Sequence, residues 1–263
     1  MGNTFLGGSG VVIEEGMEIK SPRELEAMTR AGRVVGGVLE ALQAAVKPGI
    51  KTRDLDTVAR AEITRRGAIP SFLGYRGYPA CVCVSINEEI VHGIPGDKVI
   101  MEGDVVSLDV GAIVDGYHGD AAVTVGCGKI THQAQSLIDA ARDALMAGIE
   151  AAHPGARIGD ISWAIQRLAE SRGYNVVRQY VGHGIGRRMH EEPAVPNYGK
   201  PRRGVLLRKG MALAIEPMLN IGTWRTRVME DNWTVVTEDG TLSAHFEHTI
   251  AITGDGPVIL TKL

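Results

Sequence analysis

The sequence predicts an α/β fold made of two pseudo-symmetric halves that share one sheet, and a repeated helix pair is the main evidence. Pro48-Gly49 separates two expected helices, and Pro154-Gly155 does the same 106 residues later. Four further residue pairs keep that offset: Asp54 and Asp160, Leu55 and Ile161, Arg66 and Arg172, and Gly67 and Gly173. Pro-Gly is common after helices, so chance is the alternative. Five matches in the same order of elements favour an internal duplication.

The first half, about residues 17–126, begins with a helix. Ser21-Pro22-Arg23-Glu24 is a capping box with proline at the first helical position. The helical spacing of apolar residues carries this helix to about Lys47, and a second helix runs from near Thr52 to Gly67. Strand-like segments then follow at 81–86, 104–114 and 117–126.

The second half, about residues 127–263, repeats this order. Helices are expected at roughly 131–152 and 158–172, and strands at 176–181, 211–221, 233–238, 243–253 and 257–261. Residues 1–16 have the composition of a flexible N-terminal arm. Residues 17–263 are therefore predicted to form a single domain.

Composition narrows the class of protein. The formal net charge is −3 and 44% of the residues are hydrophobic, so a sizeable core can form and no nucleic-acid or membrane-surface footprint is present. No window approaches about 18 uninterrupted apolar residues, and no secretory signal begins the chain. Cys81, Cys83 and Cys127 lack a CxxC pair, which indicates a reducing compartment. We expect a cytoplasmic protein with no membrane and no DNA partner.

Two carboxylates flank a predicted tight turn. Asp115-Gly116 between apolar, β-branched runs is typical of a two-residue hairpin turn. Closing the turn there places Asp109 opposite Ala122, with Asp120 two residues away on the same strand face. Two like charges this close repel each other unless a cation lies between them, so the hairpin predicts a cation site.

Three later residues extend this site. Glu216 lies within an apolar strand, Glu247 has an apolar setting, and His183 has glycine on both sides. Taken singly, each has an ordinary explanation: Asp109 could cap a turn, and Glu216 could pair with an arginine. Together the five residues predict a pair of divalent metal ions and metal-activated hydrolysis. Oxygen-rich ligation with one imidazole favours manganese, iron or cobalt over a thiol-rich zinc site.

Other polar residues receive no role at this point. Glu191 and Glu192 are predicted to be a solvated or rim feature, and Asp115 belongs to the turn. His132, His153 and His245 have no supporting context and are expected to be structural or surface residues.

The motifs resemble the type I methionine aminopeptidase family from about residue 17 to the C-terminus. The resemblance rests on Ser107-Leu108-Asp109-Val110-Gly111, His118-Gly119-Asp120, Gly182-His183-Gly184-Ile185-Gly186, Ile215-Glu216-Pro217-Met218 and Glu247-His248-Thr249. It implies the pita-bread fold, with helices on the outer face of a curved antiparallel sheet. The family's larger relatives, prolidase and aminopeptidase P, carry an N-terminal domain for which this chain has no room. Only 33 positions separate His183 from Glu216, too few for the type II insertion.

The resemblance also implies roles for the metal ligands. Asp109 would chelate one ion, Asp120 and Glu247 would bridge both, and His183 and Glu216 would complete the second. Water activated by the ions would attack the methionyl carbonyl, with Glu216 as the proton shuttle. Two more histidines, His92 and His190, would bind the substrate and stabilise the charge of the tetrahedral intermediate.

A methionine pocket and a monovalent cation site are further implications of the resemblance. The pocket positions are Phe72, Tyr75, Tyr78, Cys83, Met189, Trp233 and Phe246. Met189 and Phe72 depart from residues common in the family, and ordinary core packing is the alternative for the whole set. A sodium or potassium site would lie near Asn87, Glu89 and Ser243.

The expected function is removal of the initiator methionine from nascent polypeptides whose second residue is small, by a cytosolic monomer. Two divalent ions are implied, with zinc or nickel as alternatives to cobalt, manganese and iron. One rival is an X-Pro metallopeptidase of the same fold. Another is a non-catalytic relative that binds ribosomes or partner proteins. The basic segments Lys200-Pro201-Arg202-Arg203 and Arg208-Lys209 could contact ribosomal RNA, although short charge runs are more often solvated loops.

Overall fold

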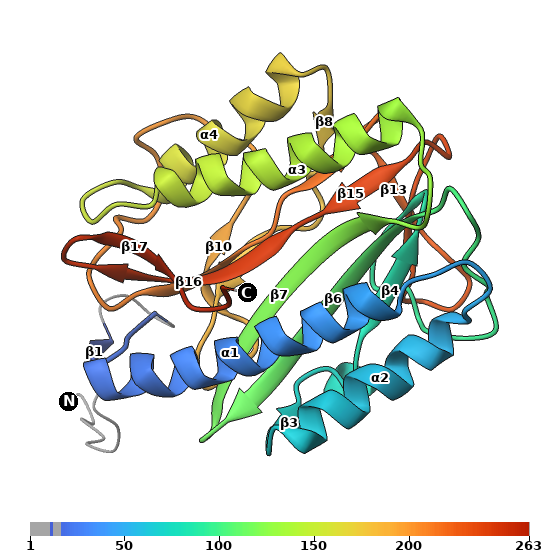
Figure 1. Cartoon of the computed structure of the whole chain (residues 1–263). Helices are drawn as coiled ribbons and strands as arrows, with labels where there is room; N and C mark the ends of the chain where they lie inside the picture. Colours follow the sequence, from blue (N-terminus) through green and yellow to red (C-terminus); the bar gives the residue numbers. More distant parts are fainter. Residues whose placement is uncertain (1–10, 13–16, 263) are drawn as a thin grey trace.

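The computed structural model describes residues 11–12 and 17–262, and it contains the two predicted helix pairs. The first pair is α1 (Pro22–Ala45) and α2 (Thr52–Arg65), and the second is α3 (His132–Glu150) and α4 (Ile158–Ser171). Figure 1 shows the two pairs flanking the long central strands. At the start of α1, Ser21 N donates to Glu24 Oε2 at 2.8 Å and Glu24 N donates to Ser21 Oγ at 3.4 Å. The predicted capping box is therefore confirmed.

A curved antiparallel sheet of nine strands joins the halves. Along it lie β10 (Glu191–Val195), β9 (Gly182–Gly184), β11 (Ala212–Ile215), β16 (Glu247–Thr253), β7 (Tyr117–Gly126), β6 (Val105–Val114) and β3 (Ile69–Pro70). β17 (Gly256–Ile259) pairs with β16, and β4 (Cys83–Ile86) pairs with β6. The two halves meet where β16 pairs with β7.

Two three-stranded sheets, one two-stranded sheet and a 3₁₀ turn complete the described fold. One sheet has the order β15 (Ser243–His245), β12 (Met218–Asn220) and β8 (Asn175–Val176). The other has the order β13 (Thr226–Val228), β14 (Val235–Thr237) and β5 (Glu89–Val91). A 3₁₀ turn, η1, covers Tyr75–Gly77. Finally, β1 (Val11–Val12) pairs with β2 (Glu18–Ile19), so the chain is a strand at two positions of the predicted arm. The remainder of that arm lies outside the described residues.

Matched local details support the internal duplication. Gly49 and Gly155 both have φ near +90° after the first helix of their pair. The second helix in each pair is 14 residues long. A carboxylate accepts a hydrogen bond from the residue before that helix in both cases: Lys51 N donates to Asp54 at 3.0 Å, and Arg157 N donates to Asp160 at 2.8 Å.

Two predicted strands are each broken in the structure. The expected strand 211–221 is interrupted at Glu216-Pro217, where proline has no N–H to donate to a ladder. The expected strand 243–253 is interrupted at Phe246, whose N–H donates to Pro217 O at 3.3 Å. On one side of the breaks β11 pairs with β16, and on the other β12 pairs with β15. Both segments of the chain therefore pass from one sheet to the other at the same place. The expected strand 176–181 is short as well, with only Asn175–Val176 paired.

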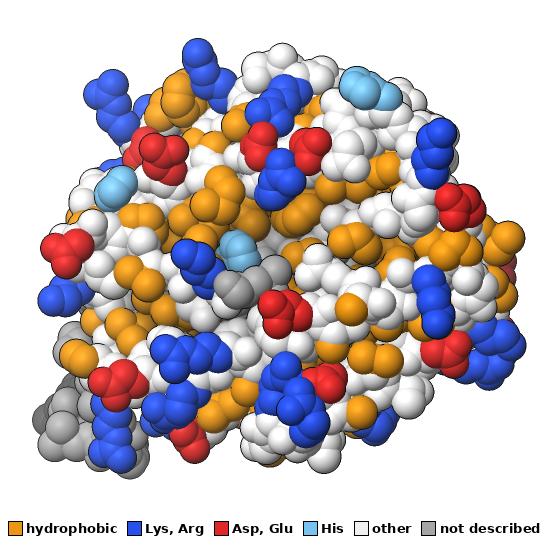
Figure 2. All heavy atoms as spheres, viewed as in Figure 1, with side chains coloured by type: hydrophobic (Ala, Val, Ile, Leu, Met, Phe, Trp, Pro, Cys, Tyr) orange, Lys and Arg blue, Asp and Glu red, His pale blue; other side chains and the backbone are white. Residues whose placement is uncertain are grey.

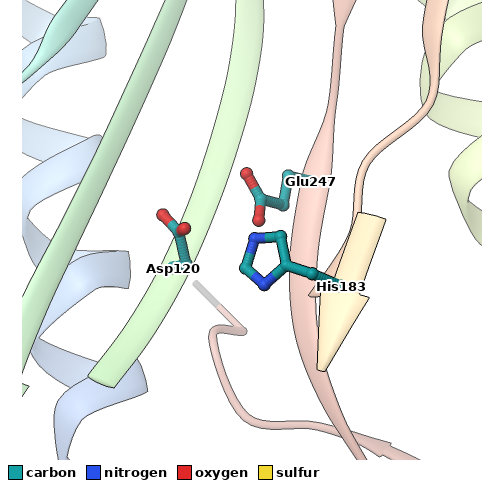
Figure 3. A group of neighbouring side chains, drawn as sticks. All are labelled: Asp120, His183 and Glu247. Atoms are coloured by element: carbon teal, nitrogen blue, oxygen red, sulfur yellow. The ribbon is translucent and has the colours of Figure 1, made fainter. Parts of the chain in front are cut away.

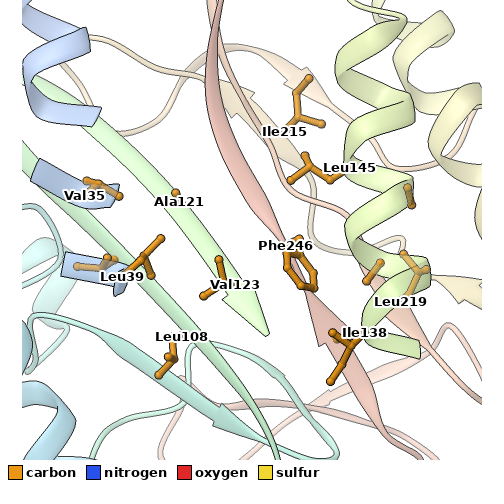
Figure 4. Close-up of a cluster of buried hydrophobic side chains, with 14 of the residues drawn as sticks. Val35, Leu39, Leu108, Ala121, Val123, Ile138, Leu145, Ile215, Leu219 and Phe246 are labelled. Carbon is orange, nitrogen blue, oxygen red and sulfur yellow. The ribbon is translucent and has the colours of Figure 1, made fainter. Parts of the chain in front are cut away.

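The main hydrophobic core lies between the helix pairs and the sheet (Figure 4). α1 contributes Val35 and Leu39, and α3 contributes Ile138 and Leu145. The strands contribute side chains that face them, among them Leu108, Ala121, Val123, Ile215 and Leu219. Both halves therefore supply one continuous hydrophobic cluster.

The surface agrees with the balanced composition. On the face shown in Figure 2, Lys and Arg side chains alternate with Asp and Glu side chains and do not gather into one large patch. Within residues 11–12 and 17–262, no helix has the length and apolar character needed to cross a membrane.

Candidate metal centre

The hairpin between β6 and β7 has the predicted turn and register. Asp115 and Gly116 have φ of 51° and 78°, and positive φ at both positions is characteristic of a type I′ turn. Asp109 pairs with Ala122, and Asp120 pairs with Gly111. The backbone of Asp120 is further tied to β16, since Thr249 Oγ1 donates to Asp120 O at 2.8 Å. The two carboxylates therefore sit on rigid, doubly paired strands.

The second half adds three side chains to the hairpin carboxylates: His183, Glu216 and Glu247. Asp120, His183 and Glu247 each offer a ligand atom, and these atoms all lie within 4.8 Å of one another. Figure 3 shows them approaching from three different strands. Glu216 Oε1 lies 3.6 Å from His183 Nε2, and Asp109 lines the same cavity. The structure thus brings all five predicted ligands together.

Electrostatics in this cluster strongly disfavour free carboxylates. Burial raises the pKa of Asp109 to about 7. Burial and the neighbouring carboxylates raise the pKa values of Asp120, Glu216 and Glu247 well above their ordinary range. Burial also lowers the pKa of His183 to about 4, so its imidazole is neutral at pH 7. A neutral imidazole beside several carboxyl groups is the arrangement that a cation would stabilise.

Unpaired oxygen atoms support a metal site directly. Asp109 Oδ1, Asp120 Oδ1 and Glu247 Oε1 are buried and have no hydrogen-bond partner among the described residues. Leaving buried polar atoms unpaired is costly. Carboxylate oxygens with one imidazole are the donors that hard or borderline divalent cations prefer. The residues present therefore fit divalent metal ions.

The five predicted ligands line one end of a cavity of about 140 Å³, and the rest of its wall is mostly apolar. Six of the seven residues expected in a methionine pocket line it: Phe72, Tyr75, Tyr78, Cys83, Met189 and Trp233. The rings of Phe72 and Tyr78 meet edge to face with centroids 6.4 Å apart, and those of Tyr78 and Trp233 do so at 5.0 Å.

Phe246 is the exception, and its placement corrects the expectation. It belongs to the main hydrophobic core together with Ile138 and Leu145 of α3 (Figure 4). Side chains alternate along an extended chain, so Glu247 points to the metal cluster while Phe246 points away from it.

His92 and His190 both line the cavity. Tyr75 Oη lies 2.8 Å from His190 Nδ1 and the two rings are stacked, while the ring centroids of His190 and His183 are 4.2 Å apart. Burial lowers the pKa of His92 to about 4 and that of His190 to about 3. Each imidazole is therefore neutral at pH 7 and carries one N–H; at His190 this is Nε2–H when Nδ1 accepts from Tyr75 Oη.

Three residues near the site were missed from the sequence. Arg76 lines the cavity. His245 is buried, and its Nε2 lies 3.9 Å from both Glu216 Oε2 and Glu247 Oε2. The alternation of side chains could have revealed His245, because it is two residues before Glu247. Glu191 is buried against Lys20, so the prediction of a solvated residue is wrong.

The suggested monovalent cation site is only partly assembled. Ser243 N donates to Asn87 O at 2.9 Å, which brings these residues together. The Glu89 carboxylate accepts from Ile86 N and from Lys98 Nζ, both at 2.8 Å. Since Glu89 already has these partners, a cation there would depend mainly on other oxygen atoms.

Comparisons with known proteins give a consistent result. A family model described as metallopeptidase family M24 matches residues 26–254. The chain is 52% identical over 244 residues to a methionine aminopeptidase of Clostridium acetobutylicum, covering 92% of this chain and 98% of that protein.

Solved structures agree in fold. A crystal structure of methionine aminopeptidase from Thermotoga maritima matches with a TM-score of 0.93 and 49% identity, covering 94% of this chain and all of that one (100%). Prolidase from Pyrococcus furiosus matches with a TM-score of 0.77 and 23% identity, covering 93% of this chain and 65% of that one. The prolidase match, at 23% identity, shows the shared pita-bread fold alone.

Proposed function

Because the chain belongs to metallopeptidase family M24, we propose that it is a methionine aminopeptidase. It hydrolyses the first peptide bond of nascent polypeptides that begin with methionine followed by a small residue. One observation carries this proposal: the five predicted ligands line one end of a cavity whose remaining wall is formed by aromatic side chains, Cys83 and Met189. In this proposal the methionine side chain occupies the apolar part of the cavity, and the peptide carbonyl lies towards the carboxylates.

Two divalent ions complete the site in this proposal. Asp109 would hold one ion, His183 and Glu216 the other, and Asp120 and Glu247 both. When bound, the ions supply Lewis acidity and a water nucleophile at neutral pH. Cobalt, manganese or iron best suit this donor set, with zinc or nickel as alternatives.

The protein's own groups handle protons and orientation. Glu216 takes the proton of the attacking water and delivers it to the leaving amine, as a general base and then a general acid. His92 and His190 each direct a neutral N–H at the carbonyl oxygen, where negative charge develops. The aromatic lining and Met189 hold the methionine side chain and exclude water.

Several further features belong to the same proposal. The enzyme acts as a cytoplasmic monomer, where nascent chains present their N-termini. The basic segments 200–203 and 208–209 are candidates for contact with the ribosome. A sodium or potassium ion near Asn87, Glu89 and Ser243 would support the loop beside β5.

Turnover of two substrates tests the proposal. Metal-loaded protein is incubated with Met-Ala-Ser and with an X-Pro dipeptide, and each measurement is repeated with Asp109→Asn. We expect cleavage of Met-Ala-Ser alone and near-complete loss in the variant. Cleavage of only the X-Pro dipeptide would identify the rival peptidase. Absence of any turnover with metal bound would support a non-catalytic relative.

A further inference from the structure

A buried ion pair outside the metal cluster joins the beginning of the domain to the loop that carries His190. Lys20 Nζ lies 2.5 Å from Glu191 Oε2, and the two side chains are 3% and 0% exposed. By contrast, the side chains of the Arg30–Asp115 pair are 50% and 61% exposed. Burying two charges is favourable only with close geometry and additional hydrogen bonds. The burial of this pair therefore needs an explanation.

Both partners are fixed by further bonds. Glu191 Oε1 accepts from Arg188 N at 3.1 Å, which closes the end of the loop between β9 and β10. Lys20 N donates to Gly210 O at 2.8 Å, and Lys20 Nζ lies 3.3 Å from Glu18 O. Lys20 is thus held by its backbone and by its side chain, and it can serve as a rigid anchor.

Gly186 is shaped to accommodate the pair. A Cβ atom at this position would lie 2.6 Å from Lys20 Cε and 2.8 Å from Glu191 Oε1. Real Cβ atoms do not approach other atoms so closely. The last glycine of the Gly182–Gly186 motif therefore leaves room for the ion pair rather than for the substrate.

The anchored loop supplies two residues to the proposed active site. Met189 is buried among Phe72, Tyr78 and Cys83 in the wall of the methionine cavity. His190 stacks on Tyr75 and directly precedes Glu191 in the chain. Tyr75 holds the ring of His190. The backbone of the loop end is held by the pairing of Glu191 with Gly184, by Gly186 N donating to Arg188 O at 3.1 Å, and by the Glu191 carboxylate accepting from Arg188 N.

We propose that Lys20 and Glu191 are positioning residues whose buried ion pair sets the loop between β9 and β10, so that His190 and Met189 face the bound methionine. This inference rests on the proposed function. Neither residue lines the cavity. Their effect passes through the backbone of the loop, from Glu191 to Arg188 and His190.

Kinetics of charge-removing variants test the proposal. Lys20→Met leaves Glu191 unpaired, Lys20→Met/Glu191→Gln removes both charges, and Lys20→Arg keeps the pair. Arg30→Met is the matched control on an exposed pair. We expect Lys20→Met and the double variant to lower kcat on Met-Ala-Ser by on the order of 10²-fold, with bound metal unchanged. Lys20→Arg should recover most of the activity, and Arg30→Met should match the wild type.

A second background separates positioning from general destabilisation. In His190→Ala protein, Lys20→Met should lower kcat by much less than in the wild type, because the group to be positioned is absent. An equal loss in both backgrounds would overturn the proposal. So would unchanged kcat in the double variant, which buries no unpaired charge and is the decisive variant should Lys20→Met fail to fold.

The ring NMR signal of His190 gives a readout independent of turnover. We expect it to shift or broaden in Lys20→Met/Glu191→Gln and to stay unchanged in Arg30→Met. If the wild type binds metal but turns over no peptide, the proposed function fails while this signal still decides the positioning. An unchanged signal in the double variant would contradict the inference.

Discussion

The two halves of the molecule each begin with a similar helix pair, but their strands differ in length and continuity. In the first half, β6 and β7 each run unbroken for 10 residues. In the second half, β11 ends after 4 residues and the chain breaks at Pro217 and Phe246. Asp109 and Glu216 lie 107 residues apart, nearly the offset of the helix repeat. The duplication thus presents a carboxylate from each half to one site.

The difference between these carboxylates suggests a division of labour. Asp109 lies inside a ladder, paired with Cys83 on one side and Ala122 on the other. Glu216 follows the last residue of β11, and its carbonyl accepts from the side chain of Asn197 at 3.1 Å. A residue inside a paired strand has a fixed backbone, which suits a permanent metal ligand. A residue at a strand break can adjust more easily, which suits a group that moves protons.

The largest expected effect comes from neutralising each of these carboxylates. Asp109→Asn and Glu216→Gln should each lower kcat on Met-Ala-Ser by on the order of 10²–10⁴-fold. Both variants lose a proposed metal ligand, so raising the metal concentration should partly restore each; Glu216→Gln, which also loses the proton shuttle, should stay impaired at metal saturation. Titration calorimetry of metal binding and steady-state kinetics provide the measurements. Full recovery of the glutamine variant would remove the distinction between the halves.

Truncating Phe246 tests whether the strand break places this side chain in the core or in the wall of the cavity. Phe246→Ala should lower the free energy of unfolding by about 3–5 kcal/mol, since it empties a site in the core, with little change in KM at permissive temperature. Trp233→Ala, in the cavity wall, should instead raise KM. Urea denaturation and kinetics on Met-Ala-Ser distinguish the two. A raised KM without lost stability in Phe246→Ala would return that side chain to the pocket.

The pH dependence of stability tests the cost of the Asp109 carboxylate. Its folded pKa is about 7, above the ordinary value of 3.8, so the folded protein keeps a proton that the unfolded chain releases. In chelated protein, Asp109→Asn should therefore gain stability relative to the wild type as pH rises from about 4 to about 7, by at most about 4 kcal/mol. Added divalent metal should reverse this gain. The measurement is the urea midpoint of the wild type and of Asp109→Asn at each pH. If burial did not disfavour the Asp109 carboxylate, the difference between the two midpoints would not change with pH.

The smallest expected effect concerns the matched carboxylates before α2 and α4. Asp54→Ala should lower the free energy of unfolding by about 1 kcal/mol, because one capping hydrogen bond is lost. Asp160→Ala should cost about 1 kcal/mol more, since Asp160 Oδ1 also accepts from Arg202 N at 2.8 Å. Equal losses in urea denaturation would mean that the contact with Arg202 contributes nothing.

Much of this molecule follows from local patterns. The capping box at Ser21, the turn at Asp115-Gly116 and the register of Asp109 depend on residues close in sequence. Their hydrogen bonds and backbone preferences act over a few positions, so they can be predicted from the chain. The strand breaks were not predicted, because the apolar runs around Glu216 and Phe246 look continuous. Pro217 alone marked one of them.

Contacts between segments that are far apart in the sequence could be identified only in the folded structure. Alternation along the strand places His245 and Glu247 on one face and Phe246 on the other, whereas the family resemblance implied that Phe246 lines the pocket. Burial of Glu191 depends on Lys20, which lies 171 positions away in the chain. No local pattern reports such a partner.

The ligand types, their glycine-rich surroundings and the repeated helix pair are properties of the chain itself, because residue chemistry and short-range spacing define them. Which face each side chain takes beyond a strand break, and which distant charge is buried beside it, depends on packing between the halves. The residues of the metal cluster could therefore be predicted from the sequence, whereas the wall of the cavity and the Lys20–Glu191 ion pair were decided by the tertiary structure.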